Sequence, residues 1–428
     1  MSKESAVRTQ LESAGFVLVQ TEPRLPGVTS SVRPDFLAWA ADGDGVLVPW
    51  AAVEVKKTRA RVHPDRALLQ LASVRDQLGT VDHYVVVDGQ WQQADRSMRV
   101  LTAVEGPGTP DNGVDGTLED VAIATSLIHE RLWDVANDRR GSSDGINPLE
   151  LFAELMPNKP SGELTTRSGA AIRVPKDVLW RAGRRALNEF ATRDQKSGLF
   201  VSRPAIAGAV AHLAGDALDG TVMDPFCGTG EFLWAAADHA EELNRSVDLT
   251  GMDLDRRMVA IAASLASAAP RPTRIFEGDS FKALPTEVDV VLSAPPLGVR
   301  LQAPYALLNG TRTLDGDLAA VDVAVRSLRA GGRAVLQVSP GVTFRKSGSA
   351  YRRFLSEEYR VAALIGCPPG TIPGTGIGSV LLVIDKCDPT TTFVAQLGGD
   401  WEEQLAADGP ALTAALGHLR NEGAEVRE

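Results

Sequence analysis

The most informative stretch of the sequence is Thr221-Val-Met-Asp-Pro-Phe-Cys-Gly-Thr-Gly-Glu-Phe-Leu233. Its pattern predicts an apolar strand, a glycine loop and the start of a helix. Gly228 and Gly230 permit a tight turn and let the backbone approach a ligand closely at the N-terminus of that helix. Because several classes of nucleotide-binding enzymes use similar turns, the loop alone leaves the ligand undetermined.

Three further segments follow at the distances that a doubly wound sheet requires. Leu249-Thr-Gly-Met-Asp253 predicts a second strand that ends in a carboxylate, which in this architecture accepts hydrogen bonds from a ribose diol. Phe276-Glu-Gly-Asp-Ser-Phe281 predicts the loop after a third strand, and Val288-Asp-Val-Val-Leu-Ser-Ala-Pro-Pro-Leu-Gly298 predicts a fourth strand and its loop. The predicted fold class is therefore α/β with a Rossmann-like parallel sheet.

In this order the motifs resemble the gamma-type DNA adenine-N6 methyltransferases, and in particular the modification subunit of type I restriction systems. The similarity extends to Gly198–Pro204 upstream and to Gly331–Phe344, Leu364–Gly370 and Gly374–Gly378 downstream. It implies S-adenosylmethionine (SAM) as the methyl donor, with Asp279 at the adenine ring. The residues that the resemblance assigns to SAM are Phe200, Ser202, Asp224, Pro225, Phe226, Gly228, Gly230, Asp253, Asp279, Ser280 and Phe281. An α/β domain whose loops bind no ligand remains the alternative.

The catalytic loop departs from that family, whose motif is Asn, Asp or Ser, then Pro-Pro and an aromatic residue. In the family, a side-chain oxygen and a backbone carbonyl orient the target amino group, and the ring stacks on the flipped base. The corresponding residues here are Ala294, Pro295, Pro296 and Leu297. Losing the side-chain acceptor is expected to cost about 100- to 1000-fold in rate, and losing the ring about 1–3 kcal/mol of base binding.

Ser293 does not replace the missing acceptor, because it stands one position too early and on a strand would face the other way. Two functions stay open for this half of the chain. One is methyl transfer to adenine N6 in DNA, and the other is a methylation-inactive scaffold or sensor that binds SAM and DNA.

The N-terminal region contains Arg33-Pro-Asp35 and Ala52-Val-Glu-Val-Lys56. Glu54 and Lys56 are two apart on a strand, so both project from one face. Carboxylates hold Mg²⁺, and a lysine beside them can position the water that attacks a phosphodiester. The pattern is similar to the PD-(D/E)xK nuclease core, with Asp35 and Glu54 as Mg²⁺ ligands, Lys56 as the catalytic lysine, and Gln70 and Glu12 as accessory groups. A surface strand of alternating Glu and Lys gives the same short pattern.

Periodicity and linker composition predict five segments. The first contains helices near residues 5–15 and 65–78 and strands at 36–40, 51–55 and 84–87. The segments are a restriction-endonuclease-like α/β domain (1–104), a linker (105–116), a helical domain (117–197), the methyltransferase-like domain (198–388) and an acidic tail (389–428).

Bulk composition is that of a globular protein, with 44% hydrophobic and 23% charged residues among 428. We expect a cytoplasmic protein without membrane association, because the sequence has no apolar run of about 18–20 residues and no secretory signal. The three cysteines, and the histidines at 63, 83 and 129, have no metal-ligand spacing.

DNA is the partner that the resemblance implies, within a restriction–modification or phage-defence system. The net charge of −11 argues against strong DNA binding by the chain alone, because phosphate contacts require clustered Lys and Arg. The tail after Lys386 is too short for a target-recognition domain. We therefore expect a separate specificity or restriction subunit, the alternative being that the chain does not act on specific sequences.

Overall fold

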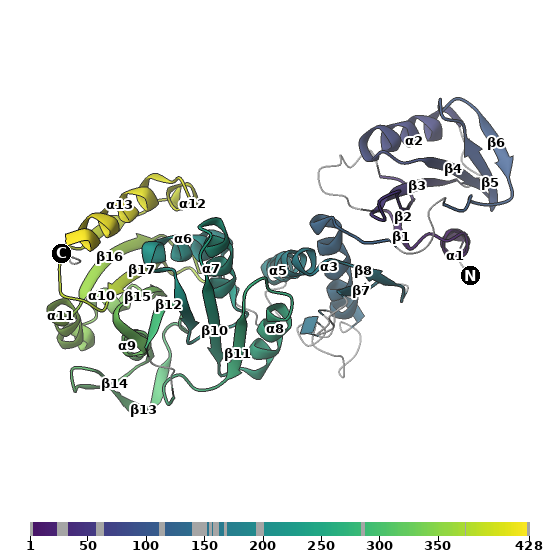
Figure 1. The fold of residues 1–428 in the computed structure, drawn as a ribbon. Coiled ribbons are helices and arrows are strands. Elements are labelled where there is room, and N and C mark those ends of the chain that lie inside the picture. The colour runs from purple at the N-terminus through teal and green to yellow at the C-terminus, as the bar shows by residue number, and fades with distance from the viewer. Residues whose placement is uncertain are drawn as a thin grey trace. The chain divides into compact units, whose positions relative to one another are not determined.

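A six-stranded and an eight-stranded sheet dominate the described residues, one in each of two units, Met1–Phe190 and Ala191–Glu428 (Figure 1). The computed structural model describes residues 3–23, 33–56, 64–110, 116–138, 152–153, 156, 162–166, 169–193, 201–283, 287–372 and 374–425. Within these residues, no helix is both long enough and apolar enough to span a membrane.

The sheet of the first unit has the strand order β1-β2-β3-β4-β5-β6. Its strands are β1 (Leu18–Thr21), β2 (Phe36–Ala41), β3 (Leu47–Lys56), β4 (Asp82–Val87), β5 (Gln90–Ala94) and β6 (Leu101–Val104). β2 and β3 are antiparallel, whereas β3 and β4 are parallel and joined by α2 (Pro64–Leu78). The helix predicted near 65–78 and the strands predicted at 36–40, 51–55 and 84–87 are thus confirmed.

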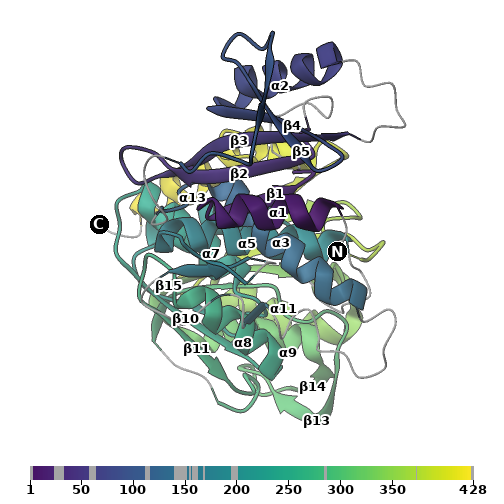
Figure 2. The ribbon, with the colours of Figure 1, turned by 90° about the vertical axis from the view of Figure 1, so that its right-hand side faces the viewer.

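Helices cover both faces of this sheet (Figure 2). α1 (Lys3–Ser13) carries Val7 and Leu11 four residues apart, so both lie on one side of the helix and pack in the core with Phe36 and Val53. α2 lies on the opposite face. Glu54 lies on β3, an interior strand of this sheet, and Asp35 directly precedes the neighbouring strand β2.

The rest of the first unit is less helical than predicted. α3 (Val121–Asp138) begins where the sequence indicates, with Asp120 accepting hydrogen bonds from the amides of Ala122 and Ile123 at 2.7 and 3.0 Å. Before α5 (Lys176–Arg193), however, the chain forms an antiparallel hairpin of β7 (Glu163–Thr165) and β8 (Ala171–Arg173). Strands of three residues are too short to show a period-two pattern in the sequence.

The sheet of the second unit has the order β11-β10-β9-β12-β15-β17-β16-β18. β9, β10, β11, β12 and β15 are parallel, and β17 is antiparallel to both of its neighbours. The strands are β9 (Gly220–Asp224), β10 (Val247–Asp253), β11 (Thr273–Glu277), β12 (Val288–Ser293), β15 (Leu328–Val338), β16 (Arg360–Cys367), β17 (Ser379–Asp385) and β18 (Phe393–Gln396). The parallel half is the Rossmann-like sheet that the sequence predicts.

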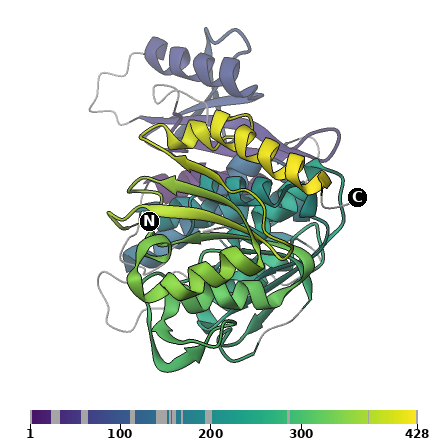
Figure 3. The same cartoon turned by 90° about the vertical axis from the view of Figure 1, so that its left-hand side faces the viewer.

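Helices lie on both faces of the larger sheet as well (Figures 1 and 3). One face carries α6 (Pro204–Ala214), α7 (Glu231–Glu242) and α13 (Pro410–Glu425), and the other carries α9 (Gly316–Ser327) and α11 (Ser349–Glu358). The remaining elements are α8 (Arg256–Ala266), a hairpin of β13 (Arg300–Ala306) and β14 (Arg312–Asp315), and the short α10 (Gly341–Phe344) and α12 (Trp401–Gln404).

The tail after residue 389 belongs to this unit rather than trailing from it. β18 pairs in parallel with β16 at the sheet edge, and α13 packs against α6. Exposed and partly buried residues alternate along β18, and a strand of four residues is too short for this alternation to mark it in the sequence.

Candidate functional site

A pocket of about 690 Å³ opens at the carboxyl ends of β9, β10 and β12. In open parallel sheets this edge is where ligands bind. The predicted residues that line it are Ser202, Asp224, Pro225, Phe226, Gly228, Asp253, Asp279, Ser280, Phe281, Ala294, Pro295, Pro296 and Leu297. The glycine loop and the Pro-Pro loop, which lie about 70 residues apart in the sequence, therefore share one cavity.

The structure describes one of the other two predicted cofactor residues. Phe200 falls outside the described residues. Gly230 is not among the lining residues, and it begins α7 with a φ of 90°. A Cβ at Gly230 would lie 2.5 Å from the ring of Trp234, whose indole N–H donates to the Thr229 carbonyl at 2.8 Å. The structure thus explains this glycine by the packing of a buried tryptophan.

Asp253 braces the glycine loop against the second strand. Its Oδ2 accepts a hydrogen bond from the Gly228 amide at 2.8 Å, and its Oδ1 accepts one from the Asp255 amide at 2.8 Å. Gly228 has a φ of 52°, which a residue with a Cβ rarely adopts. The carboxylate at the end of β10 therefore fixes the loop while it remains part of the pocket wall.

Asp224, at the end of β9, is buried beside the same loop. It accepts hydrogen bonds from the Ser293 hydroxyl at 2.5 Å and from the Phe226 amide at 3.0 Å. Burial raises its pKa to about 7, with a further increase from the charge of Asp253, while the two hydrogen bonds oppose the shift. The Ser293 hydroxyl is thus engaged by Asp224, and Ser293 is not among the described residues that line the pocket.

The loop from Ala294 to Leu297 is held rigidly although its own side chains are apolar. The Gly298 amide donates to Asp317 Oδ1 at 2.8 Å, and the Ser339 hydroxyl donates to Asp317 Oδ2 at 2.6 Å. Asp317 is 3% exposed, so this anchor is shielded from water. The hydrogen-bond acceptors that the loop itself offers to a base are consequently its backbone carbonyls.

The wall next to the third strand is aromatic. The rings of Phe226 and Phe281 lie 5.3 Å apart between centroids, and those of Phe281 and Tyr305 lie 6.0 Å apart. The Ser280 hydroxyl donates to the Pro225 carbonyl, and Asp279 accepts from the Phe281 amide at 3.0 Å. These contacts join the loop after β11 to the glycine loop.

Sequence patterns did not identify every lining residue. Leu254 is 71% exposed at the pocket, directly after Asp253, and the signal for it was an apolar residue in an otherwise polar turn. Gln337, Ile372 and Thr375 come from β15 and a distant loop, and no local pattern marks them. The acidic lining residues are Asp224, Glu231, Asp253, Asp255 and Asp279, and no Lys or Arg is among the lining residues that the structure describes. This charge suits a cationic ligand and disfavours a polyphosphate.

In the first unit, the structure brings Asp35, Glu54 and Lys56 together. Lys56 Nζ donates to Glu54 Oε2 and lies 4.0 Å from Asp35 Oδ2, which itself accepts from the Val55 amide at 2.6 Å. Gln70 on α2 donates to the Arg33 carbonyl at 2.9 Å and so fixes the segment before Asp35. Glu12 is exposed on α1.

The Glu54 carboxyl group is buried, and Lys56 compensates only part of its negative charge. Its Oε1 has no hydrogen-bond partner among the described residues. Burial raises its pKa to about 7, the Lys56 hydrogen bond opposes this, and the charge of Asp35 adds to it. A divalent cation between Asp35 and Glu54 would supply the charge and the coordination that the buried oxygen lacks, so the residues present fit Mg²⁺.

Comparisons with known proteins concern mainly the second unit. Residues 175–397 match the family model described as N-6 DNA Methylase. The type II methyltransferase M.MamI of Microbacterium ammoniaphilum is 38% identical over 92 residues, which cover 18% of this chain and 25% of that protein. The match therefore spans about a quarter of the length of that relative.

One solved structure shows the same fold, and a second is similar at a lower score. A protein described as a class I S-adenosylmethionine-dependent methyltransferase from Listeria monocytogenes superposes with a TM-score of 0.53 at 17% identity, covering 68% of this chain and 96% of its own. A type I restriction–modification methyltransferase subunit from Streptococcus thermophilus gives a TM-score of 0.48 at 19% identity, covering 56% of this chain and 58% of its own.

Proposed function

Because the chain belongs to the N-6 DNA methylase family, we propose that its second unit binds SAM and transfers a methyl group to adenine N6 in DNA, within a restriction–modification or phage-defence system. The observation that carries this proposal is the single cavity that holds both the glycine loop and the Pro-Pro loop. A donor bound at the first loop and a base inserted at the second would lie within one enclosure.

The lining residues fit SAM by charge and by shape. SAM carries a methyl group on a sulfonium sulfur, which makes that carbon electrophilic, and it also carries an ammonium group. The acidic side chains of the pocket complement these cations. Asp253 and Leu254 would contact the ribose and the adenine, and Phe281 would provide a second apolar surface for the ring.

The Pro-Pro loop limits the expected rate. A backbone carbonyl of the loop would accept one hydrogen bond from the adenine amino group, but Ala294 supplies no second acceptor and Leu297 no stacking ring. We expect methyl transfer about 100- to 1000-fold slower than with an Asn at this position.

The same two residues favour a second candidate function, in which the unit binds SAM and DNA as a scaffold or sensor without transferring the methyl group. Transfer of radiolabelled methyl from SAM to unmethylated DNA distinguishes the two, measured for wild type and for a variant with Ala294→Asn and Leu297→Phe. Slow transfer by wild type and faster transfer by the variant supports the enzyme. Transfer by the variant alone supports the sensor, and equally fast transfer by both proteins contradicts the rate limit assigned to Ala294 and Leu297.

For the first unit we propose Mg²⁺-dependent DNA cleavage by a nuclease-like domain of residues 1–104, joined through 105–116 and 117–197 to the methyltransferase domain of 198–388. Asp35 and Glu54 would hold the ion, which lowers the pKa of a bound water, and Lys56 would position that water. Cleavage of plasmid DNA with Mg²⁺ tests this proposal. Asp35→Ala and Lys56→Ala should each abolish it, and unchanged cleavage by either variant contradicts the assignment.

Partners are part of the proposal as well. With a net charge of −11, the chain needs basic surface from another subunit for strong DNA binding, so we propose a separate specificity or restriction subunit. Strong, sequence-specific DNA binding by the chain alone would contradict this.

A further inference from the structure

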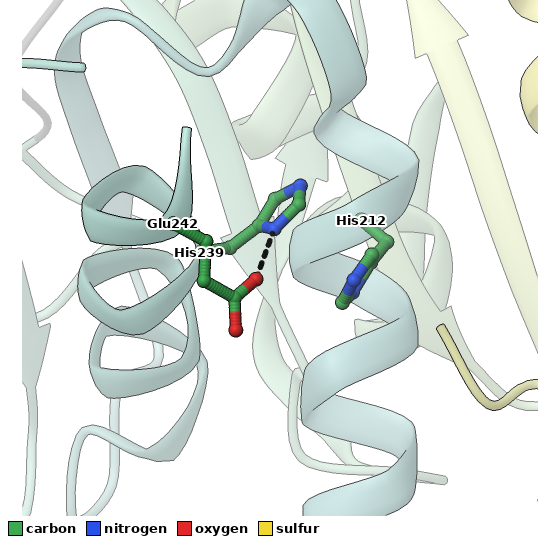
Figure 4. Close-up of side chains that lie close together, drawn as sticks. All are labelled: His212, His239 and Glu242. Atoms are coloured by element: carbon green, nitrogen blue, oxygen red, sulfur yellow. Dashed lines mark hydrogen bonds and ion pairs between the residues drawn. The ribbon is translucent and has the colours of Figure 1, made fainter. Parts of the chain in front are cut away.

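Two histidines and a glutamate converge outside both sites described above. His212 lies on α6, and His239 and Glu242 lie three residues apart on the neighbouring α7. One potential ligand atom from each side chain lies within 4.8 Å of the others. Figure 4 shows the imidazole of His212 across from that of His239, with Glu242 beside it.

Hydrogen bonds orient these side chains. His212 Nδ1 lies 2.7 Å from the Gly208 carbonyl of its own helix, which fixes the proton on Nδ1 and leaves the lone pair on Nε2. This is the usual arrangement of a metal-binding histidine, whose second nitrogen donates to a carbonyl or carboxylate. His239 Nδ1 lies 3.1 Å from Glu242 Oε2, and the two rings stack with centroids 4.0 Å apart.

The cluster lies far from the SAM pocket along the same helices. α7 begins at Glu231, which lines the pocket, and His239 follows eight residues later, or about 12 Å along the helix axis. α6 begins just after Ser202, which also lines the pocket, and His212 is near its other end. None of the three residues lines the pocket itself.

We propose that His212, His239 and Glu242 bind one late first-row divalent cation, best matched by Zn²⁺, which ties α6 to α7. Imidazole nitrogens with one carboxylate suit Zn²⁺, whereas Mg²⁺ prefers oxygen ligands alone. The ion would bind His239 at Nδ1, whose proton would move to Nε2 of the same ring, and the two stacked rings would turn so that both lone pairs point at the ion. Water would complete the coordination.

The surrounding charges are compatible with a cation. Arg245 is the basic group that acts on His239, and its guanidinium is held by Asp216 at 3.2 Å and by the Gly215 carbonyl at 3.2 Å. Glu242 is exposed, so water can reach the open coordination positions.

Calorimetric titration of the full chain with Zn²⁺ tests this inference. The parent protein for all these variants carries Asp35→Ala, which removes the Asp35–Glu54 pair of the first unit as a competing metal site. We expect one Zn²⁺ per chain. His212→Asn or His239→Asn should each weaken binding by more than the roughly 10- to 100-fold seen for changes around metal ligands. Glu242→Gln should weaken it about tenfold, and the matched control Glu241→Gln, on the exposed neighbour, should leave it unchanged.

Circular dichroism establishes that each histidine variant is folded, and the exposed Glu242→Gln change keeps the test valid if a histidine variant is not. Zn²⁺ should also raise the Tm of the parent protein but not that of the variants. Binding that survives the histidine substitutions, equal loss in Glu241→Gln and Glu242→Gln, or no saturable binding by the parent would each overturn the proposal.

Discussion

Glu54→Gln replaces a buried carboxyl group in the first unit by a neutral amide of nearly the same shape. In the folded protein, burial holds the pKa of Glu54 at about 7, compared with a usual value of 4.5. Lys56 donates to one carboxyl oxygen, but the other has no partner among the described residues, so the ion pair offsets only part of the desolvation. The ionised form is therefore destabilising, although a lysine lies beside it.

The size of the effect follows from that difference. One pKa unit corresponds to about 1.4 kcal/mol, so ionising Glu54 in the folded state costs about 3 kcal/mol. Because the folded pKa is the raised one, the folded state binds the extra proton between pH 4.5 and about 7, and stability falls as pH rises through that window. Glu54→Gln removes this dependence. Its free energy of unfolding should rise relative to wild type by about 3 kcal/mol between pH 4.5 and pH 8.

Pulsed hydrogen exchange along a urea titration measures this effect in the first unit alone. Peptides from β2 and β3 report its unfolding, and wild type and variant are compared at one pH, so the intrinsic exchange rate cancels. Mg²⁺ should stabilise wild type at pH 8 but not the variant, because the variant has lost a proposed ligand. The same substitution should abolish DNA cleavage.

If the free energies of unfolding of wild type and Glu54→Gln differed by the same amount at every pH from 4.5 to 8, this reasoning would be refuted. So would a variant that becomes relatively less stable at high pH, because that result would mean that the Lys56 interaction outweighs desolvation.

Three further changes have expected outcomes in the second unit. Asp385→Asn removes the carboxylate that accepts hydrogen bonds from Arg333 at 2.6 Å and from the buried Arg360 at 3.2 Å. The free energy of unfolding in urea should fall by about 3–5 kcal/mol. A loss below about 1 kcal/mol would contradict the importance of this buried ion-pair network. The Asp224→Asn variant should become more stable relative to wild type as pH rises from 3.8 to about 7, because burial raises the pKa of this carboxyl group in the folded protein. If the free energy of unfolding changed equally with pH in both proteins, the raised pKa of Asp224 would be contradicted. Leu254→Ala should weaken SAM binding about tenfold and leave the Tm nearly unchanged, because the side chain is 71% exposed; unaltered affinity in calorimetry would remove Leu254 from the site.

Much of the second unit could be predicted because its informative residues are contiguous. The strand, the glycine loop and the helix start lie within Thr221–Leu233, and acids end or follow the next strands, so local patterns were enough to place the pocket edge. The role of each residue was harder to predict than its position. Gly230 matches a ligand-binding glycine in the sequence, yet a Trp234 ring occupies the space a Cβ would need.

Features that depend on tertiary contact could not be predicted. His212 and His239 are far apart in the sequence and meet only because α6 and α7 pack side by side. β18 has only four residues, too few for a periodic pattern, and becomes a strand by pairing with β16. The raised pKa of Glu54 depends on how deeply β3 is buried, and an alternating Glu-x-Lys pattern is equally common on exposed strands.

The central claim is that the acidic pocket of the second unit binds SAM, and calorimetric titration of the full chain with SAM tests it most directly. We predict one site with a Kd in the micromolar range. Binding should be lost in Asp253→Ala, because Asp253 both lines the pocket and holds the Gly228 amide, and retained in Asp248→Asn, an exposed acid on the same strand. NAD should bind more weakly than SAM, because the acidic side chains among the described lining residues repel its pyrophosphate. No binding of SAM by wild type, or equal affinity in Asp253→Ala, would contradict the account.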